Sequence, residues 1–247
     1  MQRKTEALPL RKIDYSETSQ IIRFLTKDLG KISVIAKGSK RKDSNFSGTI
    51  DLFTVYEIVY IEKQPGNLDI LTSANLQKSF QTLCEDITTF SAASYIIEFG
   101  DELVADGQRI NGLYDLIINS LSDLGGKDID SVIFNFEAKA LRMLGYMPRV
   151  ENCCICQEKI ADSLSVVSFA ARHGGILCSR CKGNDPTKIW TRRGALKYLG
   201  NFSNGGVATA ISSTIKIDLR RVLNYYVCYL MEKEPRTMRF IDGRVKY

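Results

Sequence analysis

The sequence predicts an α+β protein of several domains, with an N-terminal OB-fold β-barrel followed by a helical domain that carries an inserted four-cysteine module. Three observations predict this architecture. β-type runs fill the first 80 residues, helical apolar spacing follows them, and two paired cysteine motifs interrupt the helical part. We expect the barrel at 1–80, the helical domain at 81–149 and 186–247, and the cysteine module at 150–185.

The barrel prediction depends on five β-rich runs separated by turn-forming residues. Gly30 follows Asp28 and Leu29 at an expected hairpin tip, where glycine supplies the positive φ of a tight turn. Five strands in about 75 residues suit a small closed barrel such as an OB-fold, and an SH3-like barrel is the alternative. The expected strands are 5–13, 19–27, 31–37, 50–62 and 68–77.

A basic loop lies between the third and fourth runs. Lys37, Lys40, Arg41 and Lys42 place four cations within six positions, together with a glycine and a serine. Such a loop can follow a phosphate backbone without reading the bases, so we expect it to contact nucleic acid. The alternative is a solvated charge run of the kind found on many surfaces. Further cations expected on the same face are Lys12, Arg23, Lys27 and Lys31.

The aromatic residues of the barrel allow two interpretations. They can stack on the bases of a single strand, or they can form the core and rim of the barrel, which is the commoner role. The residues concerned are Phe24, Phe53, Tyr56 and Tyr60.

Charge is unevenly distributed along the chain, although the net charge is only +6. Residues 1–80 carry 13 Lys/Arg against 9 Asp/Glu, residues 81–150 carry 5 against 11, and residues 151–247 carry 16 against 8. Two basic ends around an acidic middle indicate at least two functional surfaces. The basic ends suit a polyanion such as nucleic acid and the acidic helices suit a protein partner, whereas ordinary solvated faces are the alternative.

After residue 81 the apolar residues adopt the three-to-four spacing of amphipathic helices. The last expected helix carries Lys216, Arg220 and Arg221 off its apolar stripe and ends before Pro235. The expected helices are 83–103, 111–124, 129–144, one that begins at Thr191, and 212–232.

The strongest motif is a pair of CxxC turns. Cys153 and Cys156 form the first turn and Cys178 and Cys181 form the second, with 21 residues between them. Two residues between thiolates aim both sulfurs at one point, so two facing turns make a tetrahedral four-sulfur site that suits zinc. Cys154 lacks this spacing, and we expect it to be a bystander.

We expect the zinc to be structural rather than catalytic. Four thiolates leave no open coordination position, and the sole histidine, His173, lies in a turn between the two motifs. Two disulfides could use the same cysteines, but they require an oxidising compartment, and no apolar signal segment follows the N-terminus. We therefore expect a cytoplasmic protein without a membrane span, and the expected contact with nucleic acid makes it nucleoid-associated. A metal-free site is the remaining alternative to bound zinc.

Motifs of common enzymes and nucleotide-binding proteins are absent from the sequence. It contains no GxxxxGK[ST] loop, no GxGxxG after a strand and no HExxH. The presence of a single histidine also excludes most catalytic sites that depend on histidine as a general acid or base. We therefore expect a protein that is not an enzyme and uses no nucleotide cofactor.

Several short motifs follow one another in a characteristic order. Residues 15–30 contain Tyr-Ser-Glu and then Arg-Phe-Leu-Thr-Lys-Asp-Leu-Gly, and residues 34–41 are Val-Ile-Ala-Lys-Gly-Ser-Lys-Arg. Leu-Gly-Tyr-Met-Pro stands at 144–148, and Gly-Gly-Ile-Leu-Cys at 174–178 leads into the second CxxC turn. Their order and spacing over nearly the full length resemble the bacterial recombination mediator RecO family.

This resemblance implies an N-terminal OB-fold, a helical domain with an inserted zinc module, and DNA binding. It implies annealing of complementary single strands, including strands coated by single-strand-binding protein, and work with RecR to load the RecA recombinase. It implies that Lys37, Lys40 and Arg41 contact DNA and that the four cysteines bind the metal. It also implies that the helical domain binds the acidic tail of single-strand-binding protein, which requires an apolar pocket with a nearby cation such as Arg109 or Arg142.

Two other functions fit the same features. One is a zinc-ribbon and OB-fold adaptor that acts mainly through protein–protein contacts, with weak affinity for single strands. The other is an RNA-binding translation or ribosome factor, which competition between single-stranded RNA and DNA would separate from a DNA mediator.

Overall fold

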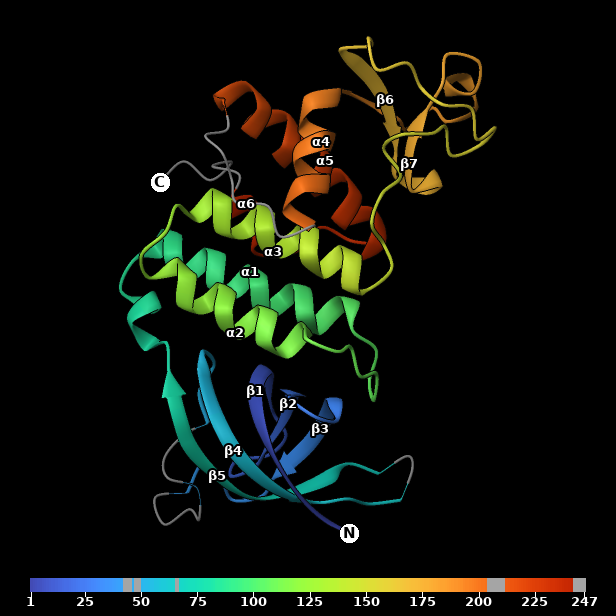
Figure 1. The fold of residues 1–247 in the computed structure, drawn as a ribbon. Coiled ribbons are helices and arrows are strands. Elements are labelled where there is room, and N and C mark those ends of the chain that lie inside the picture. Colours follow the sequence, from blue (N-terminus) through green and yellow to red (C-terminus); the bar gives the residue numbers. More distant parts are fainter. Residues whose placement is uncertain (42–45, 47–49, 65–66, 204–211, 242–247) are drawn as a thin grey trace. The chain divides into compact units, whose positions relative to one another are not determined.

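The computed structural model describes residues 1–41, 46, 50–64, 67–203 and 212–241 (Figure 1). The chain divides into two compact units, Met1–Gly126 and Lys127–Tyr247. The first unit contains the barrel and two α-helices, and the second contains the cysteine module and the other helices. The boundaries expected at 80, 150 and 185 stay a prediction.

Five strands form a closed barrel in the first unit. Their order is β1-β2-β3-β5-β4, with β3 and β5 parallel, the other pairs antiparallel, and β4 closing on β1. This is the strand order of an OB-fold, so that prediction is confirmed and the SH3-like alternative is wrong. The strands are β1 (Gln2–Asp14), β2 (Gln20–Thr26), β3 (Gly30–Ala36), β4 (Thr54–Ile61) and β5 (Asp69–Ser79).

The barrel encloses an apolar core to which every strand contributes. Alternating residues point inward, as the two-residue period of strands requires. The four aromatic residues considered for base stacking belong to the buried part of the unit, so the stacking interpretation is wrong for them. Their exposed fractions are 0% for Phe24, 4% for Phe53, 6% for Tyr56 and 3% for Tyr60.

Gly30 is required at the β2–β3 turn for two reasons. Its φ is +77°, in the left-handed region that favours glycine. A Cβ at this position would also stand 2.2 Å from the Gln108 carbonyl oxygen, so the segment that follows α1 packs directly against the turn.

Two α-helices complete the first unit and lie across one end of the barrel (Figure 1). Helix α1 (Ile87–Leu103) follows the 3-10 helix η1 (Gln81–Cys84), and α2 (Leu113–Leu124) comes next. The Asp86 carboxylate caps α1 because it accepts hydrogen bonds from the backbone N–H groups of Thr88 and Thr89. Tyr114 donates to Glu6 at 3.0 Å, which joins α2 to β1.

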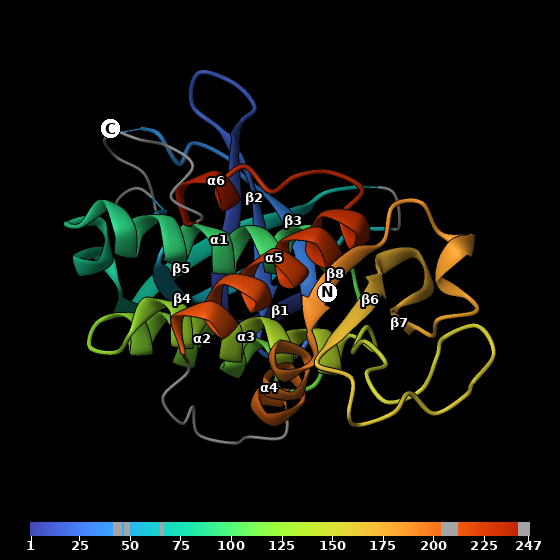
Figure 2. The same ribbon diagram turned by 90° about the horizontal axis from the view of Figure 1, so that it is seen from above.

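The second unit combines a helical group with a three-stranded sheet of order β7-β6-β8. Figures 1 and 2 show the sheet to one side of the helices. Phe169 of β6 packs edge-on against Tyr226 of α5, with ring centroids 5.6 Å apart, so one face of the sheet is buried on that helix. The elements are α3 (Ile129–Met143), β6 (Val166–Ala170), η2 (Ala171–His173), β7 (Gly175–Leu177), η3 (Lys182–Asn184), β8 (Ile189–Arg192), α4 (Arg193–Ser203), α5 (Ser213–Leu230) and α6 (Met238–Ile241).

The helix expected to begin at Thr191 begins at Arg193 instead, because residues 189–192 form strand β8. This segment contains Ile, Trp and Thr, which favour strands, and it pairs antiparallel with β6. Tertiary pairing therefore extends the sheet of the cysteine module up to the start of α4.

Helix α5 has 18 residues and supplies much of the buried surface of the helical group. It begins after Ser212, whose side chain accepts a hydrogen bond from the Ile215 backbone N–H. None of the helices in the described ranges combines the length and the hydrophobicity that a membrane span requires.

Candidate nucleic-acid interface and metal centre

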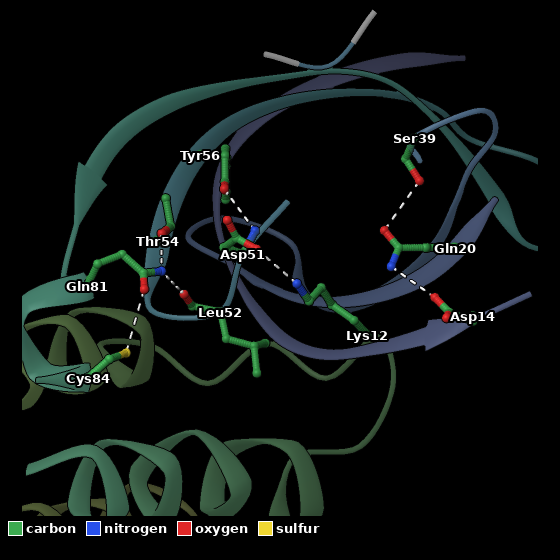
Figure 3. Close-up of polar contacts among 10 residues, drawn as sticks. All are labelled: Lys12, Asp14, Gln20, Ser39, Asp51, Leu52, Thr54, Tyr56, Gln81 and Cys84. Atoms are coloured by element: carbon green, nitrogen blue, oxygen red, sulfur yellow. Dashed lines mark hydrogen bonds and ion pairs between the residues drawn. The ribbon is translucent and has the colours of Figure 1, made fainter. Parts of the chain in front are cut away.

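The first half of the basic loop is anchored to the turn between β1 and β2. The Lys40 backbone N–H donates to the Thr18 carbonyl at 3.1 Å, and the Ser39 hydroxyl donates to Gln20 at 3.4 Å. Gln20 in turn donates to Asp14 at 3.1 Å, as Figure 3 shows. Because Ser39 is buried, the backbone that presents the neighbouring cations has a fixed position on the barrel.

Lys40 has a carboxylate partner in this network. Its Nζ lies 3.0 Å from Asp14 Oδ2. The hydrogen bond from Lys40, followed by that from Gln20, lowers the pKa of Asp14 below its ordinary value of 3.8. The Asp14 carboxylate therefore neutralises much of the Lys40 charge.

Lys37 and Arg41 keep their charges available to an outside anion. Both are exposed, and neither forms an ion pair with any residue that the structure describes. The Arg41 backbone N–H bonds to the Gly38 carbonyl at 3.0 Å, which folds the chain into a turn at this point. Lys42, the fourth expected cation, lies outside the described residues.

The remaining cations expected on this face all contact carboxylates. Arg23 Nη1 lies 2.7 Å from Asp101 Oδ1. Lys31 is wrong as a surface cation, since it is 5% exposed and its Nζ donates to the Asp101 carbonyl at 2.6 Å. The two other pairs are Lys12 with Asp51 at 3.1 Å, which Figure 3 includes, and Lys27 with Glu6 at 4.0 Å.

The four cysteines of the CxxC turns lie together. The sulfurs of Cys153, Cys156, Cys178 and Cys181 are all within 4.8 Å of one another. Tetrahedral zinc with Zn–S bonds of about 2.3 Å requires sulfurs about 3.8 Å apart, and Cys156 Sγ is 3.7 Å from Cys178 Sγ. That separation is far longer than the roughly 2.05 Å of a disulfide. The donor set and its spacing therefore fit a four-thiolate metal site.

Backbone N–H groups favour a thiolate at Cys153. Burial raises the pKa of Cys153, but N–H donors of Cys156, Cys178 and Ile155 outweigh it and lower that pKa to about 6. Cys154 lies outside the cluster, as its spacing predicts, and burial raises its pKa.

Arg180 and His173, near the cluster, each face a carboxylate. Arg180 forms an ion pair with Glu158 beside the cysteines. His173 Nε2 lies 3.8 Å from Asp185 Oδ2, and the histidine is not a member of the metal-binding group. The arrangement therefore offers a closed four-sulfur centre of the structural kind.

A pocket of about 680 Å³ lies between α3 and α5 in the second unit. Phe134, Ile217 and Tyr225 contribute apolar surface. Three cations line the same pocket, together with two carboxylates: Lys216, Arg220 and Arg221, and Asp130 and Glu234.

Arg220 is the most buried of these three cations. Its Nη1 lies 3.4 Å from Glu137, a residue with no exposed surface, and its guanidinium carbon lies 4.4 Å from the Phe134 ring centroid. Its Nη2 is 3.7 Å from Asp130 and has no hydrogen-bond acceptor among the described residues. A buried donor without an acceptor favours an added carboxylate.

Sequence reasoning did not identify this pocket. Lys216, Arg220 and Arg221 follow an i, i+4, i+5 spacing, which places them on one side of a helix. This spacing was the sequence feature that could have indicated a basic pocket wall. Arg109 and Arg142, the cations considered for such a pocket, are exposed and do not line it.

Two family models together match nearly the whole chain. The model "Recombination protein O N terminal" matches residues 1–80, and "Recombination protein O C terminal" matches residues 84–239. A DNA repair protein RecO of Rhodopirellula baltica is 30% identical over 97% of this chain and 98% of its own length. Proteins of the same name from Desulforamulus reducens and Exiguobacterium sibiricum are 27% and 29% identical, covering 98% and 97% of this chain and 95% and 96% of their own lengths.

Proposed function

The chain belongs to the recombination protein O family of DNA repair proteins, and from this premise we propose that it is a non-catalytic recombination mediator. In this proposal it binds single-stranded DNA and anneals complementary strands coated by single-strand-binding protein. With RecR it then helps to load RecA. It works in the cytoplasm, in association with the nucleoid.

The observation that carries the DNA-binding proposal is the pair of exposed cations on the anchored turn of the barrel. Lys37 and Arg41 have no ion-pair partner among the described residues, and hydrogen bonds to the β1–β2 turn fix the backbone beside them. Contacts of this kind act on phosphates, so binding is tolerant of sequence and steeply dependent on salt. Lys40 and Lys42 belong to the same basic run of the sequence, while Lys27 and Arg23 contribute less because carboxylates face them.

Annealing follows from charge neutralisation. Two single strands repel each other through their phosphates, and cations that contact both strands reduce this repulsion. Base pairing then supplies the driving force, so the reaction needs neither ATP nor a catalytic residue.

The four-cysteine centre holds a structural zinc ion in this proposal. Zinc prefers tetrahedral thiolate sites, and Cys153, Cys156, Cys178 and Cys181 supply four sulfurs at a compatible spacing. Its contribution is to hold the two CxxC turns together, because metal binding in such modules is coupled to their folding.

We place the acidic tail of single-strand-binding protein in the pocket between α3 and α5. The pocket combines apolar walls with three cations against two carboxylates, an excess of positive charge that suits an acidic peptide with hydrophobic side chains. A carboxylate of the tail would provide the acceptor that Arg220 Nη2 does not find among the described residues.

Annealing of two complementary oligonucleotides, each precoated with the cognate single-strand-binding protein, tests the proposal without ATP and across a salt series. The expected result is acceleration over the protein-free rate that fades as salt rises. No acceleration by folded, metal-containing protein, together with tight binding to single-strand-binding protein, would favour the adaptor function instead. Equal or better competition by single-stranded RNA would favour the RNA-binding function.

A further inference from the structure

The side chain of Trp190, the chain's sole tryptophan, is half-exposed on strand β8. Leu164 and Val166 beside it are also half-exposed, so the ring belongs to an apolar surface patch rather than standing alone. Proteins that hold single strands stack bases on exposed aromatic rings. Phe24, Phe53, Tyr56 and Tyr60 of the barrel are buried and cannot do this, whereas the Trp190 ring is accessible to a base.

Trp190 lines a pocket of about 330 Å³ on the face of the three-stranded sheet opposite Phe169. Ser168 pairs with Trp190 on one side and with Leu177 on the other, so these three residues share this face. Residues 158–161 form a second wall, and Cys178 of the metal centre borders the pocket. The volume is near the lower limit for small-molecule sites and suits a single flat ring system.

Two lysines of this pocket are placed to contact phosphates. Lys182 Nζ lies 5.2 Å from the Trp190 ring centroid, and Lys159 also lines the pocket. Glu158 is the carboxylate among the lining residues, and Arg180 forms an ion pair with it. A phosphate on either side of a bound base would therefore meet a lysine and no unbalanced carboxylate.

We propose that this pocket, the Trp190 pocket, binds one base of single-stranded DNA. The base stacks on the Trp190 ring, and Lys159 and Lys182 contact the flanking phosphates. The inference rests on the proposed DNA-binding function and adds to it a base contact in the second unit, separate from the phosphate contacts of Lys37 and Arg41. A protein partner would also use an exposed tryptophan, but the small volume and the two lysines favour a nucleotide.

Fluorescence of Trp190 tests the stacking directly, because no other tryptophan contributes to the signal. The full-length, metal-containing protein is titrated with oligothymidine and with an abasic oligonucleotide of equal length and charge. Stacking predicts quenching by oligothymidine and little quenching by the abasic strand. Quenching of equal size by both strands would overturn the inference, since it would report phosphate binding alone.

Affinity for a labelled oligothymidine, measured by anisotropy, completes the test. Trp190→Ala should weaken binding by about fivefold to a hundredfold, the range that one base–aromatic stack supplies, whereas Trp190→Phe should retain most of the affinity. Tyr229→Ala is the matched control, because Tyr229 is a half-exposed aromatic residue of α5 that does not line this pocket. Metal content is measured for each variant to verify that the module is intact.

The outcomes separate this inference from the function on which it rests. A Trp190→Ala protein that keeps its metal and binds oligothymidine as tightly as the wild type would overturn the base contact and leave DNA binding intact. Trp190 quenching by single-strand-binding protein but not by DNA would also overturn it, and would identify the patch as a protein-docking surface. A wild-type protein with no affinity for single-stranded DNA would overturn both.

Discussion

Arg23 of β2 donates to Asp101 of α1 at 2.7 Å, and the Asp101 side chain is only 6% exposed. The ion pair joins the barrel to its covering helix within the first unit. Lys31 of β3 reaches the backbone carbonyl of the same aspartate at 2.6 Å. Two cations of the barrel therefore meet at one helical residue, and their charges stabilise the fold of this unit.

Replacing Arg23 with alanine should destabilise the first unit more than it weakens DNA binding. The substitution leaves the Asp101 carboxylate buried without its nearest cation, although Lys31 Nζ remains 4.0 Å away. Removing one partner of a buried pair typically costs about 3–5 kcal/mol, and we expect about 2–4 kcal/mol here because Arg23 is partly exposed and Lys31 stays. Urea unfolding measures the loss.

The double variant Arg23→Ala/Asp101→Asn provides the control for this prediction. Removing the unpaired charge should restore part of the lost stability. Unchanged stability of Arg23→Ala combined with a large loss of DNA affinity would contradict the structural role and make Arg23 a direct DNA contact.

Replacing Lys37 and Arg41 together with alanine should weaken single-strand binding and flatten its salt dependence. Each lost phosphate contact lowers the slope of log K against log salt by about 0.7 on a single strand, so two contacts predict a change of about 1.4. Lys63→Ala is the matched control, since Lys63 is an exposed cation after β4 with no ion pair among the described residues. An unchanged slope would remove the loop from the interface.

The anchor of the basic loop should weaken in acid. The pKa of Asp14 is lowered by Lys40 and Gln20, so the stabilisation is present above the ordinary value of 3.8 and is lost as pH falls through the depressed folded-state pKa. Hydrogen exchange at the Lys40 backbone N–H, compared between wild type and Asp14→Asn, follows the anchor. The two proteins should differ at neutral pH and converge below the Asp14 pKa, and a constant difference would contradict this account.

The barrel and the four-cysteine cluster could be predicted from the sequence because both depend on local sequence patterns. Alternating apolar residues with Gly30 at a tip specify strands, and two CxxC turns specify four sulfurs aimed at one point. These patterns involve residues only a few positions apart, so they can be recognised in the sequence before any tertiary contact is known.

The partners of the charged residues could not be predicted in the same way. Arg23 and Asp101 are 78 positions apart, and a basic residue in a strand gives no local sign of which helix will meet it. The pocket cations Arg220 and Arg221 likewise gain their surroundings from Phe134 of α3, which only the fold brings near. Strand β8 formed where a helix start was expected because its partner, β6, lies about 20 positions earlier.

Loss of one cysteine ligand should release the metal and loosen the module. Cys178→Ser removes a thiolate from the four-sulfur group, and metal binding in such modules is coupled to their folding. We expect less bound zinc and faster proteolysis within 150–192, measured by metal analysis and mass spectrometry of the fragments. Cys154→Ser is the matched control, since Cys154 lies outside the group and the variant should keep its metal. Equal zinc content in both variants would contradict the assignment.

Binding of an acidic tail peptide should depend on the guanidinium of Arg220. Arg220→Lys keeps a positive charge near the buried Glu137 but removes the forked donor, so the fold should persist while the peptide loses a charge-assisted hydrogen bond. Such bonds contribute about 1.5–3 kcal/mol, which predicts a roughly tenfold to hundredfold weaker affinity for a labelled C-terminal peptide of single-strand-binding protein. Arg142→Ala should bind the peptide normally, because Arg142 does not line the pocket. If Arg220→Lys is folded and binds as the wild type does, or if Arg142→Ala is the variant that fails, the tail lies elsewhere on the helical group.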